Sequence, residues 1–158
     1  MQKCIFVVGL TLALIAGAAS AHAEKEEMTY RANAQDIDME RIKMIESSGD
    51  PTAFNKKSGA RGLYQITPIC LREWNSNHWR EQYTLDDLFD PEINYRIANW
   101  YMNIKIPFYL RVYGIEDIPE NRVIAYNWGI GNLRKYIRGR KTLPKETKNY
   151  LLKYNEGR

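Results

Sequence analysis

Cysteine and histidine are scarce in this chain of 158 residues, which has two of each. Cys4 and His22 fall in an N-terminal segment that we expect to be removed, so Cys70 and His78 would remain alone. A disulfide needs a pair of cysteines and a structural zinc site needs several Cys or His ligands, so we expect neither. No motif marks a nucleophile that His78 could serve, and we interpret it as a surface or packing residue.

Long apolar runs are also missing, except at the N-terminus. Lys3 precedes a charge-free run over 5–19, and the sequence Ala-His-Ala ends at Ala23. This order is typical of a secretory signal peptide, and the run is shorter than the ~20 residues that a membrane anchor needs. We therefore predict export to the periplasm or the medium. The predicted parts are a signal peptide (1–23), a flexible leader (24–33) and a single domain (34–158).

An excess of charge of one sign is lacking too. The formal net charge is +4, and removal of Lys3 with the signal peptide would lower it to +3. Such a charge is compatible with an anionic polymer as partner but indicates none by itself. We expect no nucleic-acid partner, no cofactor and a monomer.

Alternation of the β-strand type is absent, whereas helical spacing recurs along the chain. Met39, Ile42 and Ile45 predict a first helix that Gly49-Asp50-Pro51 stops. Thr67-Pro68 and Asp90-Pro91 are typical helix starts, with a capping side chain before a proline. Pro119 and Pro144 open further helices, and we expect Pro107 to end or kink one. The predicted fold class is mainly α.

Glu46 falls in the last turn of the first predicted helix, beside Ile42 and Ile45. The negative end of the helix dipole and apolar surroundings would both favour its protonated form. A glycosidase needs such a carboxylic acid as its proton donor. Taken alone, however, a glutamate at a helix end is more often solvated.

Three further segments favour a catalytic role for Glu46 over that of a solvated surface residue. Glu46-Ser47 is followed by GARGLYQITP over 59–68 and, far downstream, by AYNWGIG over 125–131. Asp90-Pro91-Glu92-Ile93-Asn94 lies between them. Together these segments resemble the lytic transglycosylases of the soluble (SLT) type, whose domain is similar to goose-type lysozyme. The resemblance extends from about Ile37 to Tyr150.

The resemblance implies a single lysozyme-like helical domain with a substrate cleft, acting on peptidoglycan strands. Glu46 would be the sole catalytic acid and base. It would protonate the bond between N-acetylmuramic acid (MurNAc) and N-acetylglucosamine (GlcNAc), and then take a proton from the muramic acid's own C6 hydroxyl. That hydroxyl would close a 1,6-anhydro ring. The resemblance also implies substrate-binding roles for Ser47, Gln65, Tyr126 and Asn127, with the Tyr126 hydroxyl near the catalytic carboxyl. Ser47 would also steady the Glu46 carboxylate or the end of its helix.

The chain departs from the family pattern in two places. Tyr64 stands where methionine is usual, which would alter one cleft contact. The stretch before Gly59 is one residue longer than usual, so the family's substrate-binding serine corresponds to Asn55 or to Ser58.

Other functions stay open at this point. Because no second carboxylate is evident near Glu46, we favour the anhydro-forming lyase over a goose-type lysozyme-like hydrolase. A non-catalytic glycan-binding module is a further alternative. The enzyme could also open the wall locally for a secretion, pilus or phage-related assembly.

Overall fold

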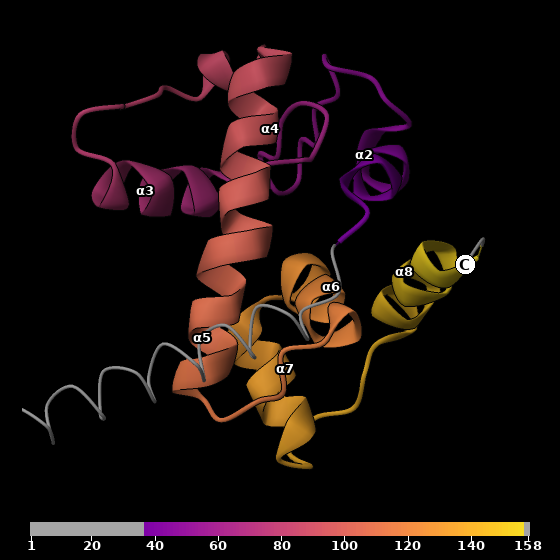
Figure 1. Ribbon diagram of the computed structural model, residues 1–158. Helices are drawn as coiled ribbons and strands as arrows, with labels where there is room; N and C mark the ends of the chain where they lie inside the picture. The colour runs from indigo at the N-terminus through magenta and orange to yellow at the C-terminus, as the bar shows by residue number, and fades with distance from the viewer. Residues whose placement is uncertain (1–36, 157–158) are drawn as a thin grey trace, which may run out of the picture. The chain divides into compact units, whose positions relative to one another are not determined.

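The computed structural model describes residues 37–156, so the predicted signal peptide (1–23) and leader (24–33) lie outside the described residues. The described part is helical, apart from two isolated β-bridges, and the mainly α prediction is confirmed (Figure 1). None of its helices is both long enough and apolar enough to cross a bilayer. In chain order the helices are α2 (Met39–Ser47), α3 (Pro68–Asn77), the 3-10 helix η1 (Asp86–Phe89), α4 (Pro91–Trp100), the π-helix η2 (Tyr101–Lys105), α5 (Ile106–Val112), α6 (Pro119–Trp128), α7 (Ile130–Ile137) and α8 (Lys145–Asn155).

The predicted helix starts are confirmed by side-chain caps. The Thr67 hydroxyl accepts a hydrogen bond from the backbone N–H of Cys70 at the start of α3. A carboxylate oxygen of Asp90 accepts hydrogen bonds from the N–H groups of Glu92 and Ile93 at the start of α4. Each cap satisfies backbone donors that have no partner within the helix, and the proline after it occupies the first helical position.

Pro107 neither ends a helix nor stands at a sharp break. The chain continues from α4 through η2 into α5, and the N–H of Ile106 bonds to the carbonyl of Tyr101, five residues earlier. The wider π turn falls directly before Pro107, which has no N–H to donate and whose ring would clash with the carbonyl four residues earlier in a regular helix. One long rod therefore spans the domain (Figure 1), and the π turn sets the position of Tyr101.

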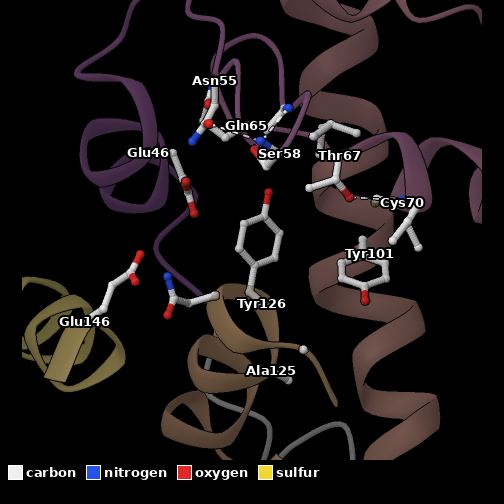
Figure 2. Close-up of a pocket in the computed structure, with 15 residues that line it drawn as sticks. Glu46, Asn55, Ser58, Gln65, Thr67, Cys70, Tyr101, Ala125, Tyr126 and Glu146 are labelled. Carbon is white, nitrogen blue, oxygen red and sulfur yellow. Dashed lines mark hydrogen bonds between the residues drawn. The ribbon is translucent and has the colours of Figure 1, made fainter. Parts of the chain in front are cut away.

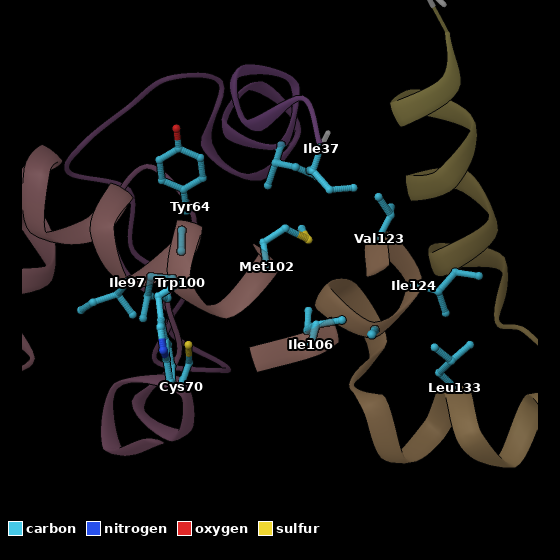
Figure 3. Packing of buried hydrophobic residues seen from close by; sticks show 14 of the residues in the cluster. Ile37, Tyr64, Cys70, Ile97, Trp100, Met102, Ile106, Val123, Ile124 and Leu133 are labelled. Atoms are coloured by element: carbon cyan, nitrogen blue, oxygen red, sulfur yellow. The ribbon is translucent and has the colours of Figure 1, made fainter. Parts of the chain in front are cut away.

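The core forms around α6, which packs against α5, α7 and α8. Its residues 121–125 are all buried. Figure 3 shows Val123 and Ile124 from this helix beside Ile106 and Leu133 from its neighbours. Since α6 ends at Trp128, its rigid C-terminal half carries Ala125, Tyr126 and Asn127 toward one face of the domain.

One buried asparagine, Asn94, fixes the loop between α2 and α3 through side-chain hydrogen bonds. The side-chain oxygen of Asn94 accepts the N–H of Tyr64 (2.8 Å), and its amide group donates to the carbonyls of Arg61 (2.9 Å) and Leu88 (2.7 Å). Glycine at position 62 allows Asn94 to approach the loop this closely. Gly62 has a φ of +75°, and a Cβ there would lie 2.3 Å from the Asn94 amide nitrogen. The loop is therefore a fixed wall against which a site can form.

Candidate functional site

A cleft of about 460 Å³ opens between α2, the loop before α3, η2, α6 and the start of α8 (Figure 2). Its volume falls in the ~300–1,000 Å³ range of small-molecule sites. It gathers three of the segments singled out in the sequence, the Glu46-Ser47, GARGLYQITP and AYNWGIG stretches. The lining residues are Glu46, Asn55, Ser58, Ala60, Gln65, Ile66, Thr67, Ile69, Cys70, Tyr101, Ala125, Tyr126, Asn127, Gly129 and Glu146.

Glu46 lies in the last turn of α2, as predicted, and its side chain projects into this cleft. Burial raises the pKa of its carboxyl from the ordinary 4.5 to about 7, because the charged form loses its hydration. A hydrogen bond from Tyr150 favours the charged form and opposes the shift, but has the smaller effect. At neutral pH the carboxyl is therefore poised both to give and to accept a proton.

Tyr150 is a site residue that the sequence did not reveal. Its hydroxyl donates a 2.8 Å hydrogen bond to Oε1 of Glu46, joining α8 to α2 across 104 positions of sequence. Tyr150 is buried, so the hydroxyl is held in place by the packing of α8. This bond fixes the orientation of the Glu46 carboxyl.

The loop wall carries Asn55, Ser58 and Gln65, and both candidates for the family's serine position line the cleft. The Asn55 side-chain oxygen accepts the N–H groups of Lys57 and Ser58, which leaves its amide hydrogens to donate elsewhere. The Ser58 hydroxyl accepts a hydrogen bond from the N–H of Ala60, and its own proton remains available to donate to a ligand. Gln65 donates to two loop carbonyls, so its side-chain oxygen is the group left for a ligand.

Tyr126 and Asn127 form the floor contributed by α6. The Tyr126 hydroxyl donates a 2.8 Å hydrogen bond to the backbone carbonyl of Tyr64, which ties α6 to the loop wall. The carboxyl of Glu46 is instead bound by Tyr150. Burial raises the pKa of the Tyr126 phenol, and the negative charge of Glu46 adds to that shift. Figure 2 shows the Tyr126 hydroxyl pointing toward Ser58 and Gln65.

Two predicted substrate-binding residues lie outside the cleft lining. The Ser47 hydroxyl donates to the carbonyl of Leu63 and accepts the N–H of Gly49, so it joins the end of α2 to the loop. The Tyr64 side chain is 1% exposed and packs near Tyr95. The next residue, Gln65, has a φ of +48°, and its side chain, not that of Tyr64, lines the cleft. Neither side chain lines the cleft, and both residues stabilise the loop that forms its wall.

Glu146 is a second carboxylate in the cleft, and it was not identified from the sequence. It lies in the first turn of α8, one helical turn before Tyr150, and lines the cleft. Figure 2 shows it on the side of the cleft opposite the loop wall. Asp50, the nearest acidic residue to Glu46 in sequence, has only a turn role, since it is exposed and accepts hydrogen bonds from Thr52.

Between residues 37 and 156 no cluster of His, Cys, Asp or Glu has the composition of a metal site. The chemistry that the described cleft offers is that of carboxylic acids and hydrogen-bonding amides and hydroxyls. Such a set suits acid–base cleavage of a neutral polar polymer such as a glycan.

Three comparisons with known proteins were made. The comparison with curated proteins found no match. Among solved structures, the 70 kDa soluble lytic transglycosylase SLT70 from Escherichia coli is similar, with a TM-score of 0.60 and 25% sequence identity. The similar region covers 72% of this chain but 19% of that enzyme, so the chain spans about a fifth of its length. The expected lysozyme-like fold is confirmed by this similarity. Residues 25–149 match the family model of the transglycosylase SLT domain. The chain belongs to the transglycosylase SLT domain family.

Proposed function

We propose that this chain is a peptidoglycan lytic transglycosylase that cleaves the β-1,4 bond between MurNAc and GlcNAc and leaves 1,6-anhydro-MurNAc ends. The observation that carries the proposal is the Glu46 carboxyl, half-buried in a polar cleft with its pKa raised to about 7. Membership of the SLT family and the similarity to SLT70 support the same activity.

The proposed reaction uses Glu46 twice. Its protonated carboxyl gives a proton to the glycosidic oxygen as the bond to C1 of MurNAc breaks, and GlcNAc leaves with a free hydroxyl. The carboxylate that remains takes the proton from the C6 hydroxyl of the same MurNAc. The C6 oxygen then bonds to C1, and the carboxyl is protonated again, so no water is consumed.

Other residues have supporting roles in this proposal. Tyr150 holds the Glu46 carboxyl through its 2.8 Å hydrogen bond. Asn55 and Ser58 supply donors to the sugar, and Gln65 supplies an acceptor. Asn127 lines the opposite part of the cleft, and its side-chain amide forms no hydrogen bond with the described residues, so it is free for the sugar's acetamido groups.

A hydrolase of the goose-type lysozyme kind is the second candidate, and Glu146 is the observation that favours it. In an inverting hydrolase a second carboxylate about 6.5–9.5 Å from the acid activates water. We favour the lyase because the pKa of Glu46 suits a group that acts first as acid and then as base. The Glu146→Gln variant decides between them: release of anhydro ends by the variant supports the lyase, and loss of all cleavage supports a water-activating Glu146.

The direct test of the proposed catalyst is Glu46→Gln, which keeps the size of the side chain and removes the proton. We expect it to abolish clearing of purified cell wall while the protein still folds and still binds wall. Glu40→Gln is a matched control on the same helix, because Glu40 is exposed and pairs with Lys43. Clearing by Glu46→Gln at the wild-type rate would place the catalyst elsewhere.

We further propose that the chain is exported by its N-terminal signal segment, cut after Ala23, and acts outside the cytoplasm. Local opening of the wall for a secretion, pilus or phage-related assembly is the role we propose for it there. Mass spectrometry of the exported protein tests the first point, since a mature N-terminus at Glu24 is expected. Loss of that assembly on deletion of the gene, restored by wild type but not by Glu46→Gln, tests the second.

A further inference from the structure

The positive charge of the described residues is gathered in one part of the chain. Residues 134–148 contain seven Lys or Arg and one Glu, a net charge of +6, whereas residues 37–129 contain eleven basic and thirteen acidic residues, a net charge of −2. Every basic side chain in the first range except Arg134 is exposed. None of them forms an ion pair with another described residue. These cations are therefore open to an anionic partner.

Arg138, Arg140, Lys141 and Lys145 form the part of this cluster that we call the cationic rim, the loop from the end of α7 to the start of α8. The loop has a defined path. The N–H of Arg140 bonds to the carbonyl of Lys135 at 2.8 Å, closing the end of α7, and Pro144 leads into α8. The cations are consequently displayed from a fixed turn.

The cationic rim adjoins one end of the cleft. Lys141 Nζ lies 5.2 Å from the centre of the Trp128 ring and donates a 2.8 Å hydrogen bond to Asn132. Asn132 in turn donates to the backbone carbonyl of Trp128 at 2.7 Å. The two residues that flank Trp128, Asn127 and Gly129, line the cleft, as does Glu146 immediately after Lys145.

The substrate of the proposed reaction carries its negative charge beside the glycan, not within it. Stem peptides branch from the muramic acid residues and bear free carboxylates, whereas the sugar backbone between them is neutral. A strand that lies in the cleft must therefore carry its peptides out over the rims. An exposed Arg or Lys at that point attracts a carboxylate and offers it N–H donors.

We propose that the cationic rim binds the free carboxylates of the stem peptide, so that the enzyme prefers glycan strands that carry acidic peptides. This inference rests on the proposed function, of which it names the substrate more closely. An anionic membrane is the competing partner, because Tyr136 and Ile137 are partly exposed next to Arg138. The contact of Lys141 with Trp128, whose two neighbours in sequence line the cleft, favours the peptide.

The test compares two wall samples and two double variants. One wall sample is native, and in the other the peptide carboxylates are converted to methylamides with carbodiimide and methylamine. Arg140→Gln with Lys145→Gln removes two exposed charges from the rim. Arg72→Gln with Lys153→Gln removes two exposed charges that do not line the cleft, as a matched control.

We expect the rim variant to release fragments from native wall about fivefold more slowly than wild type at limiting wall, the scale expected for two exposed ion pairs. On amidated wall the variant and wild type should agree within about twofold, since the pairs are absent there. The control variant should match wild type on both samples. Equal losses on both samples, the same loss in the control, or no loss at all would overturn the proposal.

Two further measurements separate the possible failures. Loss of sedimentation with anionic phospholipid vesicles in the rim variant, with unchanged wall cleavage, would overturn the peptide in favour of a membrane. If wild type cleaves neither wall sample, the proposed function fails. The rim is then judged by binding alone, and equal sedimentation of wild type with native and amidated wall would reject it.

Discussion

The hydroxyl of Tyr150 donates a hydrogen bond of 2.8 Å to Oε1 of Glu46, and so joins the last helix of the domain to the first described one. The bond lowers the pKa of Glu46, while burial raises it by more, and the balance is a pKa of about 7. A carboxyl with this pKa can exchange its proton in both directions near neutral pH. Tyr150 is thus a positioning residue that also limits how far the pKa rises.

Tyr150→Phe should move the pH dependence of cleavage. Without the hydrogen bond, the charged form of Glu46 loses a stabilising partner, so the pKa of Glu46 rises and the alkaline limb of the rate profile moves to higher pH. The free energy of unfolding should also fall by about 1 kcal/mol. Tyr95→Phe, at an exposed tyrosine, serves as control. An unchanged alkaline limb would show that Tyr150 does not act through Glu46.

The wild-type enzyme should itself lose activity as pH rises through about 7, the pKa of Glu46. The reason is that the first step needs the protonated carboxyl in the free enzyme. Initial rates at limiting wall, measured between pH 5 and 9, give the profile. A rate that keeps rising above neutral pH would be incompatible with Glu46 as proton donor.

The stability of the protein should also depend on the protonation of Glu46. Glu46 has a pKa of about 7 in the folded protein and 4.5 when unperturbed, so the folded state binds the proton more tightly than the unfolded state. The contribution of Glu46 to stability is thus greatest at low pH and declines between pH 4.5 and 7.

Glu46→Gln, which stays neutral, should therefore raise the free energy of unfolding at pH 8 by roughly 2 kcal/mol and have little effect near pH 4. Urea unfolding at the two pH values measures the difference. A variant less stable than wild type at pH 8 would contradict the raised pKa of Glu46 in the folded protein.

Local sequence was sufficient to predict the helix starts and the position of Glu46. Thr67 and Asp90 cap their helices through neighbouring backbone groups, so their role is readable within a few residues. Glu146 and Tyr150 were missed because their place in the cleft depends on how α8 packs against α2 and α6. Tyr64 was misplaced because its burial depends on how the loop packs near Tyr95 of α4, a contact between distant parts of the chain.

Gly62→Ala should be severely destabilising. The added Cβ would lie 2.2 Å from the carbonyl oxygen of Leu88 and 2.3 Å from the Asn94 amide nitrogen, and the φ of +75° is strained for alanine. Loss of the Asn94 hydrogen bonds would add to that strain, for a total of about 3 kcal/mol or more.

Gly114→Ala is a matched control, because its φ is also positive but no atom lies within 4 Å of the added Cβ. Thermal unfolding should show a small loss for Gly114→Ala and a much larger one for Gly62→Ala. Equal losses would mean that backbone strain alone, without the contact with Asn94, accounts for the effect.

We propose that Glu46 cleaves the glycan without water, and the mass of the products is the most direct test of this step. Purified wall is digested with the wild-type enzyme, and the soluble fragments are analysed by mass spectrometry. We expect every new MurNAc end to carry the 1,6-anhydro ring. MurNAc ends heavier by one water, formed from the start of the digestion, would contradict it and identify the enzyme as a hydrolase.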